Sequence, residues 1–446
     1  MFVGRKKELK FLEDNFAGMA NKLLVVYGHK GVGKSSLMLN FAADRRYHYY
    51  SAGPCAECEQ LLLWGNTLGE KTADFDAVFE NIRVKLQGKH LIVIDEFQNL
   101  IRYSENFMPA LIKYIKSENV RCMVVLVSSS ISFVETDFVP RVGSMALNIS
   151  SFYKLNELGF MDCVNYFKDY TTRQCMEIYS ITGGMPAYWN ALDPGASVEE
   201  NIIKHILSPS GMLYYEGERI VSAELRELNV YSTLLNCLSG GMNKLNELHT
   251  HSGFSRAKIS VYLKNLMERE LVEKVFPYDN ASGLNAKKGV YRISMRLLEF
   301  YFRFMFSKRS DLEMLTPEEF YRKHVEKQIR EFHQGNFCKV CGEYLEILNQ
   351  NNMLPIKVSE RGEWVGKNGT IDIVMQDEED ECLLAFCDWM SDEIDTDRLK
   401  SYLATAKEAR LTPDHLYIFA TGRFSDELKD HAANNSFLKL VDIDTL

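Results

Sequence analysis

The chain has 446 residues, of which 46% are hydrophobic and 25% are charged, a profile that predicts a soluble globular protein of two or three domains. The net charge of -9 excludes a general binder of polyanions, so any nucleic-acid contact must come from a local basic patch. The charged N-terminus lacks the apolar core of a signal peptide, and no segment approaches the ~20 apolar residues of a membrane span, which predicts a cytoplasmic protein without membrane contact.

The N-terminal part of the chain alternates short apolar runs with helical patterns. The predicted strands are LLVVY (residues 23–27), YHYYS (47–51), LIVID (91–95) and CMVVLVS (122–128). The segments between them carry apolar residues at spacings of three and four, as amphipathic helices do. Strands that alternate with helices usually form a parallel sheet. An α/β fold is therefore predicted for the N-terminal domain.

A phosphate-binding motif follows the first predicted strand. GHKGVGKS matches G-x-x-x-x-G-K-[ST] and lies between an apolar strand and a helical pattern. Its glycines let backbone amides and the N-terminus of the next helix face a triphosphate. Lys34 is expected to reach the β- and γ-phosphates and Ser35 to ligate Mg²⁺, so that ATP and Mg²⁺ are the predicted cofactors. The predicted nucleotide-binding positions of the loop are Gly28, His29, Lys30, Gly31, Val32, Gly33, Lys34, Ser35 and Ser36.

Two adjacent acids end the third predicted strand. Asp95 and Glu96 are expected at the carboxyl edge of the sheet, where ligands bind in open α/β folds. Asp95 is the predicted Mg²⁺ ligand, through water, and Glu96 is the predicted catalytic base that polarises the attacking water. Ser128 and Ser129 lie at the end of the next strand, and one of them, with Ser129 as the candidate, is expected to present a hydroxyl to the γ-phosphate or the attacking water. The alternative is that these serines form a turn. The acid pair and the extra strand between the loop and the acids indicate an additional-strand ATPase.

Ten cysteines are scattered along the chain. Two CxxC pairs, Cys55/Cys58 and Cys338/Cys341, would suffice for a four-thiolate zinc site. Such pairs usually lie close together in sequence, however, and the second pair falls in a predicted helix. In a reducing compartment, the simpler interpretation is thiols in apolar surroundings.

From about residue 155 the pattern becomes helical, and a compact unit extends from about residue 229 to 306. The order within this unit is helix, turn, helix, turn, helix and strand. The third helix has an apolar stripe formed by Ile259, Leu263, Leu266 and Met267. Another face of this helix carries Arg256, Ser260 and Lys264. The hairpin that follows carries Lys287, Lys288 and Arg292. Five basic and three acidic residues between positions 256 and 274 give a mild positive bias. The unit is predicted to bind either DNA or another protein.

Five motifs, in this order, resemble the archaeal-type AAA+-related ATPases that also occur in bacteria. They are MFVGRKKELKFLE, GHKGVGKS, LIVIDEFQNL, VVLVSSS and ITGGMPAYW. Gly4-Arg5 with Glu8-Leu9 is similar to the G-R-x-x-E-L motif of that family, and residues 183–188 are similar to the G-G-x-P-x-Y motif that marks its helical lid. The resemblance covers nearly the whole chain. It implies that the unit after the lid is a winged helix, whose third helix enters a major groove or contacts a protein.

One arginine departs from the family pattern. The family has a Gly-Arg pair shortly after the fourth strand, whereas this chain reads FVPRVGS and leaves Arg141 without its glycine. Arg141 is a candidate for a catalytic arginine that senses the γ-phosphate, and the alternative is an ordinary surface arginine.

The tail resembles the nuclease-like domain that often closes members of this family. RGEWVGKNGTIDIV is similar to the signature G-R-W-W…E-I-D-[IV]-V, which implies that Asp372 is a metal-binding acid and that Glu326 is the helical acid before it. Where the family has a pattern like G-E-x-K-W, this chain reads AFCDW. Phe386 therefore replaces a metal ligand, and Asp388 replaces the cation that stabilises phosphate charge.

The acidic character of this tail strengthens the expectation of lost nuclease activity. Residues 376–397 contain ten Asp/Glu and no Lys/Arg, a surface expected to repel nucleic acid. We predict a nuclease-like fold that does not cleave nucleic acid. The alternative is that Glu393 and Lys400 complete the site from a nearby helix.

The predicted architecture is a P-loop ATPase domain with a parallel sheet of the additional-strand class (residues 1–155), a helical lid (156–225), a winged helix (226–308) and a small α+β nuclease-like domain (309–446). The predicted function is that of an Mg²⁺-dependent ATPase that acts as a nucleotide-driven switch, with ATP and ADP as ligands and DNA or a protein as partner. One alternative is a nucleotide-gated signalling or binding protein with little turnover, and a weaker one is a DNA-processing nuclease. The sequence leaves the oligomeric state open.

Overall fold

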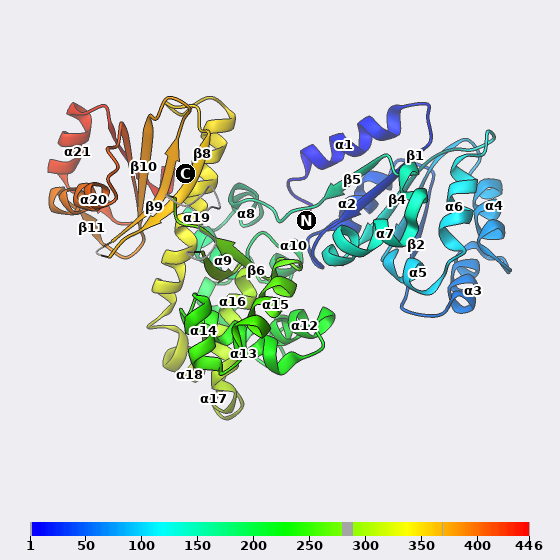
Figure 1. The fold of residues 1–446 in the computed structure, drawn as a ribbon, viewed down its shortest axis with the longest axis horizontal. Helices are drawn as coiled ribbons and strands as arrows, with labels where there is room; N and C mark the ends of the chain where they lie inside the picture. The colour runs from blue at the N-terminus through cyan, green and yellow to red at the C-terminus, as the bar shows by residue number, and fades with distance from the viewer. Residues whose placement is uncertain (1, 279–288, 368, 446) are drawn as a thin grey trace. The chain divides into compact units, whose positions relative to one another are not determined.

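In the computed structural model, the described residues are 2–278, 289–367 and 369–445. The chain divides into two compact units, shown with colour following residue number in Figure 1. The first unit contains residues 1–158 and 185–187, and the second contains residues 159–184 and 188–446. The finer division into four domains stays a prediction. No helix among the described residues is long and apolar enough to cross a membrane.

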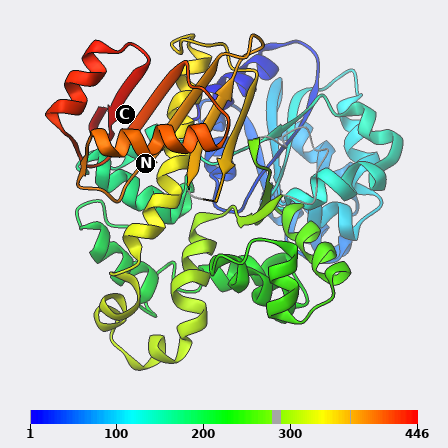
Figure 2. The ribbon, with the colours of Figure 1, turned by 60° about the vertical axis from the view of Figure 1, so that its left-hand side comes forward.

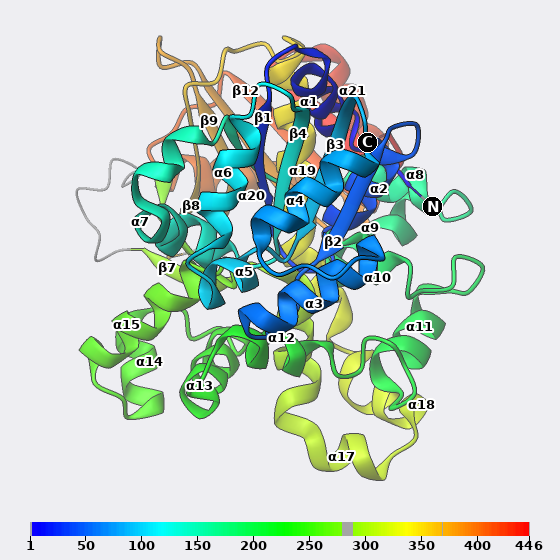
Figure 3. The same cartoon turned by 90° about the vertical axis from the view of Figure 1, so that its right-hand side faces the viewer.

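Five parallel strands form the sheet of the first unit, in the order β2-β3-β4-β1-β5. They are β1 (Lys22–Tyr27), β2 (Tyr47–Ser51), β3 (Lys89–Asp95), β4 (Arg121–Ser128) and β5 (Ser151–Lys154). Figure 3 shows β4 between β1 and β3. Because β1 precedes the phosphate loop and β3 ends in the acid pair, this order confirms the predicted additional-strand α/β fold.

Two details of this sheet differ from the expectation. The strand inserted between the loop strand and the acid strand is β4, whereas β2, which lies between them in sequence, is at the edge beyond β3. The edge strand β5 was not predicted, because SFYK has no apolar run and its residues are half-buried or exposed. Its pairing with β1 depends on tertiary contacts rather than on local pattern.

Helices cover both faces of this sheet. One face packs against α3 (Glu57–Leu68), α4 (Phe75–Lys85), α5 (Gln98–Tyr103) and α6 (Phe107–Ile115). Trp64 lies at the centre of that core and stacks on Tyr50 with ring centroids 4.3 Å apart. The remaining helices of the unit are α1 (Lys6–Ala17), α2 (Lys34–Ala42) and α7 (Val139–Val142), and α1 packs on α2.

The first part of the second unit is helical. It contains α8 (Phe160–Tyr166), α9 (Thr172–Thr182), α10 (Pro186–Trp189, which begins in the first unit), α11 (Val198–Asn201) and α12 (Glu216–Glu224). The predicted three-helix unit follows as α13 (Leu228–Ser239), α14 (Leu245–Ser252), α15 (Arg256–Met267) and the antiparallel strands β6 (Val272–Val275) and β7 (Val290–Ile293). Lys287 and Lys288 of the predicted hairpin lie outside the described residues.

The C-terminal part of the second unit contains a mixed sheet in the order β14-β12-β10-β9-β8. Its strands are β8 (Glu360–Val365), β9 (Thr370–Gln376), β10 (Cys382–Asp388), β12 (His415–Ala420) and β14 (Leu438–Asp442), and β11 (Glu393–Ile394) pairs separately with β13 (Arg423–Phe424). The helices are α16 (Arg296–Phe300), α17 (Arg309–Met314), α18 (Pro317–Phe320), α19 (Ile329–Gln350), α20 (Thr396–Glu408) and α21 (Asp426–Asn434). Figure 2 shows α20 in front of this sheet and α19 behind it. Alternate residues of β10 therefore face different helices.

Candidate nucleotide-binding site

The phosphate loop joins the end of β1 to the start of α2. Gly28, Gly31 and Gly33 have φ angles of 158°, 93° and 97°, in the region that favours glycine. A Cβ atom at Gly28 would lie 2.3 Å from the carbonyl oxygen of Leu155, so a side chain is excluded there. The loop leads directly into the N-terminus of α2, where the helix dipole and free amides favour an anion.

Lys34 is held inside this loop. Its ammonium group donates hydrogen bonds of 2.9 Å to the carbonyl oxygens of Gly28 and His29, and the residue is only 5% exposed. Burial lowers the pKa of Lys34 to about 8, while the charges of Glu96 and Asp95 oppose that shift. The side chain therefore remains mostly cationic at neutral pH and places a positive charge within the loop.

The other predicted loop positions are spread between interior and surface. Val32 is buried, His29 is half-buried, and Lys30 and Ser36 are exposed. Ser36 lies in the first turn of α2, beside Ser35. These positions can contribute backbone amides to a phosphate without a buried side chain.

The loop and the acid strand meet at Ser35 and Asp95. The Ser35 hydroxyl donates a 2.7 Å hydrogen bond to Oδ2 of Asp95, and Asp95 is 5% exposed. Tyr49, the middle residue of β2, also donates its hydroxyl to this carboxylate, and burial followed by that bond raises the pKa of Tyr49. A hydroxyl and a carboxylate oxygen are suitable ligands for Mg²⁺, directly or through water, so these residues fit the predicted ion. Tyr49 was not among the predicted site residues, because its contact with Asp95 depends on the pairing of β2 with β3 rather than on a local pattern.

Glu96 lies next to this pair and is held by β4. Its φ angle is 53°, and its Oε2 accepts a 2.7 Å hydrogen bond from the Ser129 hydroxyl and a bond from the Gln98 amide. Ser128 is buried, and its Oγ accepts a 3.1 Å bond from the amide of Ser130. Ser128 therefore forms a turn, whereas the hydroxyl of Ser129 faces Glu96.

Arg141 lies apart from this cluster. It is exposed on α7 and lines a cavity of about 460 Å³ with residues of α5 and α6, none of which belongs to the phosphate loop. In the described part of the chain, Arg141 forms no hydrogen bond or ion pair with Lys34, Asp95 or Glu96. The structure therefore gives the candidate sensing arginine no place at the loop within its own chain.

Two motifs of the family resemblance contact the phosphate loop. Arg5 is 6% exposed and donates from its guanidinium to the carbonyl oxygens of Val32 (2.7 Å) and Asn156 (2.8 Å). On the other side, the amide of Ala187 donates a 3.2 Å hydrogen bond to the carbonyl oxygen of Gly31. The G-R and G-G-x-P-x-Y motifs therefore both lie against the loop, although they are distant from it in the sequence.

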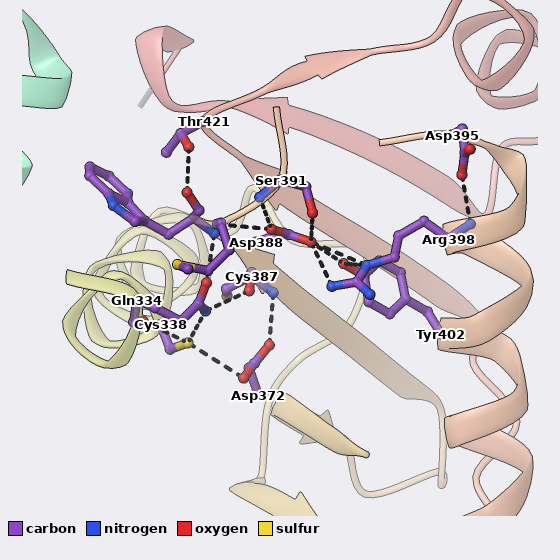
Figure 4. A network of polar contacts seen from close by, with 12 residues as sticks. Gln334, Cys338, Asp372, Cys387, Asp388, Ser391, Asp395, Arg398, Tyr402 and Thr421 are labelled. Carbon is purple, nitrogen blue, oxygen red and sulfur yellow. Dashed lines mark hydrogen bonds and ion pairs between the residues drawn. The ribbon is translucent and has the colours of Figure 1, made fainter. Parts of the chain in front are cut away.

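The second predicted site, in the C-terminal sheet, is arranged differently (Figure 4). Oδ2 of Asp372 accepts a 2.8 Å bond from the amide of Cys387, and burial raises the pKa of Asp372 to about 6. Phe386 is buried and stacks on Tyr402 with centroids 4.3 Å apart. Asp388 is 2% exposed and accepts a 2.8 Å bond from Arg398, so it is not the exposed negative charge that we expected. Its hydrogen bonds to Ser391 and Arg398 help to lower its pKa against the effect of burial.

The expected helical acid, Glu326, and the alternative pair Glu393 and Lys400 all have other positions in the structure. Glu326 is exposed and precedes α19, and the side chain of that helix that contacts Asp372 is Cys338. Lys400 is exposed and pairs with Asp397 at 2.7 Å, and Glu393 is exposed on β11. The helix α20 does supply a cation, but it is Arg398 and it binds Asp388.

The basic residues of the three-helix unit are partly engaged within the chain. Lys264 pairs with Glu268 at 3.7 Å, and Arg256 donates a 2.9 Å bond to the side chain of Asn246. Arg292 donates a 2.8 Å bond to Glu363 on β8, so this hairpin cation is directed to the C-terminal sheet. Fewer free cations remain for a phosphate backbone than the sequence suggested.

Comparison with known proteins gives two family matches and one relative similar over most of both chains. Residues 1–125 match the family described as "AAA ATPase domain", and residues 301–400 match a family described as "Archaea bacterial proteins of unknown function". An uncharacterized protein of Methanocaldococcus jannaschii is 27% identical over 428 residues, which cover 92% of each chain. The match to residues 1–125 confirms the predicted resemblance to AAA+-related ATPases.

Solved structures place the fold. The Walker-type ATPase PABY2304 of Pyrococcus abyssi is similar with a TM-score of 0.51 and 15% identity, over 68% of this chain and 96% of that one. The ORC2 protein of Aeropyrum pernix, in complexes with ADPNP and ADP, has a TM-score of 0.45 and 14% identity over 72% of this chain and 94% of its own. The first similarity confirms the P-loop ATPase fold, whereas the second is too low to support a conclusion about this chain.

Proposed function

We propose that this protein binds ATP with Mg²⁺ at the loop of residues 28–35, hydrolyses it, and acts as a nucleotide-driven switch. The observation that carries the proposal is the meeting of Ser35, Asp95, Glu96 and Ser129 beside Lys34 at the carboxyl edge of β1, β3 and β4. A hydroxyl, two carboxylates, a buried ammonium and a helix N-terminus are the groups that phosphoryl transfer needs in one place.

Each of these residues has a separate role in the proposal. ATP and Mg²⁺, when bound, supply the reactive phosphoryl group and the charge that neutralises it. Lys34 leaves the carbonyl oxygens of its own loop and binds the β- and γ-phosphates. Ser35 and Asp95 hold Mg²⁺, and Glu96 orients water and accepts its proton.

The contacts of Glu96 favour one alternative function. Its carboxylate is engaged by Ser129 and Gln98, and a base with these bonds has to exchange them before it binds the attacking water. This arrangement suits a protein that spends most of its time with nucleotide bound and turns over rarely. In that case ATP occupancy, rather than hydrolysis, shifts the population of conformations.

The route from nucleotide to switch runs through the chain itself. Met185, Pro186 and Ala187 pack with the first unit between two segments of the second, which the chain re-enters at Tyr188. The hydrogen bond from Ala187 to Gly31 therefore attaches the start of this connection to the phosphate loop. We propose that phosphate binding, by moving Gly31, changes the position of this segment.

For the second unit, we propose an interaction role in the cytoplasm, through the winged helix and the nuclease-like sheet, without nucleic-acid cleavage. DNA and protein are the two candidate partner classes. The engagement of Arg292 by Glu363 and of Lys264 by Glu268 favours a protein partner, because these cations already have carboxylate partners.

Phosphate release and partner capture test the proposal together. Steady-state phosphate release by the full-length protein is measured with ATP and Mg²⁺, with and without duplex DNA, and compared with ATP binding measured directly. Binding with release in the presence of Mg²⁺ supports the ATPase, and binding with negligible release supports the nucleotide-gated alternative. Absence of ATP binding contradicts both. Proteins that co-purify with Glu96→Gln held in ATP, but not with Lys34→Ala, then identify the partner class.

A further inference from the structure

Two thiols and a carboxylate converge in the C-terminal sheet, outside the nucleotide site. They are Cys338 of α19, Cys387 of β10 and Asp372 of β9, and one ligand atom from each lies within 4.8 Å of the other two. Figure 4 shows the Cys338 thiol directed at Asp372 and the backbone amide of Cys387 bonded to the same carboxylate. The proposed function does not use this cluster.

The spacing of these atoms suits a tetrahedral metal ion. With Zn–S of about 2.3 Å and Zn–O of about 2.1 Å, a sulfur and an oxygen on one tetrahedron are about 3.6 Å apart. Sγ of Cys338 and Oδ1 of Asp372 are 3.4 Å apart. All three ligand atoms lie within 4.8 Å of one another, a limit only about 1 Å above the sulfur–sulfur edge of such a tetrahedron.

The surrounding hydrogen bonds hold the three side chains in orientation. The amide of Cys387 binds one oxygen of Asp372 at 2.8 Å and leaves the other oxygen directed at Cys338. Gln334 of α19 donates to the carbonyl oxygen of Cys387 at 2.8 Å and accepts from the amide of Trp389 at 2.7 Å. Bonds of this kind around a ligand set typically fix ligand direction in metal sites.

The type of ligand decides the type of metal. Mg²⁺ prefers oxygen ligands in octahedral geometry, whereas two thiolates with one carboxylate suit Zn²⁺ and similar ions. Two positions where the family has a metal ligand and a lysine have other contacts in this chain. Phe386 stacks on Tyr402, and Asp388 binds Arg398. The potential metal ligands beside Asp372 are therefore the sulfur atoms of Cys338 and Cys387.

A cavity gives the cluster access to solvent. Cys338, Asp372 and Cys387 all line a cavity of about 750 Å³ in the second unit. This cavity provides an approach for an ion and room for a water molecule as the fourth ligand. Cys341 lies three residues after Cys338 and its thiol contacts Cys387, but it is not among the three mutually close groups.

We propose that Cys338, Cys387 and Asp372 bind one Zn²⁺ ion, with water in the fourth position. Binding converts both thiols to thiolates and releases their two protons to solvent, with no change in oxidation state. The ion joins α19 to β9 and β10 and so stabilises the interaction domain, whatever the activity of the nucleotide site.

Metal titration of the reduced, chelator-treated full-length protein tests this proposal without nucleotide. We expect one equivalent of Zn²⁺ to bind in competition with a chromophoric chelator. Co²⁺ should give the near-ultraviolet thiolate band and the intense visible bands of a tetrahedral site, which a magnesium-type oxygen site does not give. Cys338→Ala and Cys387→Ala should each weaken Zn²⁺ binding at least about 100-fold.

Three matched variants make the assignment specific. The double variant Cys55→Ala/Cys58→Ala removes the other CxxC pair, and Cys382→Ala removes another buried thiol of β10; both should bind Zn²⁺ as the wild type does. Asp372→Asn keeps the shape of the side chain and should weaken Zn²⁺ binding while the circular dichroism spectrum is unchanged, which separates ligation from misfolding. Zn²⁺ binding that is lost in the Cys55/Cys58 variant but kept in Cys338→Ala overturns the proposal. A disulfide between Cys338 and Cys387 in a protein that binds no Zn²⁺ also overturns it.

Discussion

Ser35 and Asp95 are joined by a 2.7 Å hydrogen bond although 60 positions separate them in the chain. They follow β1 and end β3, two strands that are not neighbours, since β4 lies between them. The bond therefore spans the inserted strand at the carboxyl edge of the sheet. A hydroxyl and a carboxylate brought together in this way need little rearrangement to share one Mg²⁺ ion.

Replacement of Lys34 tests the phosphate loop. Lys34→Ala removes a cation that is expected to bind two phosphates, and it should weaken ATP binding by about 10- to 100-fold or more and abolish turnover. Affinity is measured by calorimetry and phosphate release by a coupled assay. Lys30→Ala is the control, because it removes an exposed lysine of the same loop and should retain most of the affinity. Wild-type affinity in Lys34→Ala would count against the assigned site.

Replacement of Glu96 separates binding from hydrolysis. Glu96→Gln retains an oxygen that can accept the Ser129 hydrogen bond but cannot take a proton, so ATP should bind normally while phosphate release falls by about 10²- to 10⁴-fold. Single-turnover assays with Mg²⁺-ATP provide the measurement. Asp95→Asn is the comparison, since it should impair the Mg²⁺ dependence as well. If phosphate release by Glu96→Gln equals that of the wild type, Glu96 is not the base.

The local motifs could be predicted from the sequence, whereas the contacts between distant segments could not. The loop geometry around Lys34 follows from glycines whose spacing is visible in eight residues. The contacts of Tyr49 with Asp95 and of Arg5 with Val32 depend on sheet order and on the path of the N-terminal segment. No local pattern in the sequence encodes these distances.

In the C-terminal sheet, the sequence likewise did not predict which charged side chains are buried. Counting acids between residues 376 and 397 predicts a repelling surface, but it does not show that Asp388 is buried against Arg398, the first basic residue beyond that range. The choice of Glu326 as the helical acid failed for a related reason. The phase of α19 against the sheet decides which side chain meets Asp372, and that side chain is Cys338.

Arg5 should stabilise the phosphate loop through its hydrogen bonds to backbone carbonyl oxygens. Its guanidinium holds the carbonyl oxygens of Val32 and Asn156, so Arg5→Ala should lower the free energy of unfolding by about 1.5–3 kcal/mol and weaken ATP binding. Urea unfolding and calorimetric ATP titration measure the two effects. Lys7→Ala removes an equal charge from an exposed position of the same segment and serves as the control. Equal effects of the two variants would show that only net charge matters.

His333 should make the second unit sensitive to acid. Burial, with a smaller contribution from Arg173, lowers the pKa of His333 to about 3, and its ring is hydrogen-bonded to Ser180. Below pH ~6.5, His333 binds a proton in the unfolded chain, whereas in the folded chain it stays neutral until about pH 3. The stability of the folded protein therefore falls as the pH falls through this window. Between pH 6.5 and 5, the free energy of unfolding should fall by about 1.6 kcal/mol. Urea unfolding of the wild type and His333→Gln at these pH values measures it, and parallel curves would exclude His333 as the cause.

AFCDW, residues 385–389, covers the end of β10 and the residue after it. We expect the full-length protein to leave linear, circular and single-stranded DNA and RNA intact in Mg²⁺ and in Mn²⁺, because phenylalanine cannot ligate a metal and Asp388 is committed to Arg398. Metal-dependent cleavage that disappears in Asp372→Ala would refute this expectation.

Reverting AFCDW toward the family pattern should not restore cleavage. In Phe386→Glu/Asp388→Lys, a lysine would face Arg398 without its carboxylate, and the stack of Phe386 on Tyr402 would be lost. A lysine at the buried position 388 would be an unpaired charge beside a second cation, so thermal melting should detect a destabilised second unit before any nuclease assay shows a gain. A stable double variant that cuts DNA would mean that only these two side chains separate this sheet from an active nuclease.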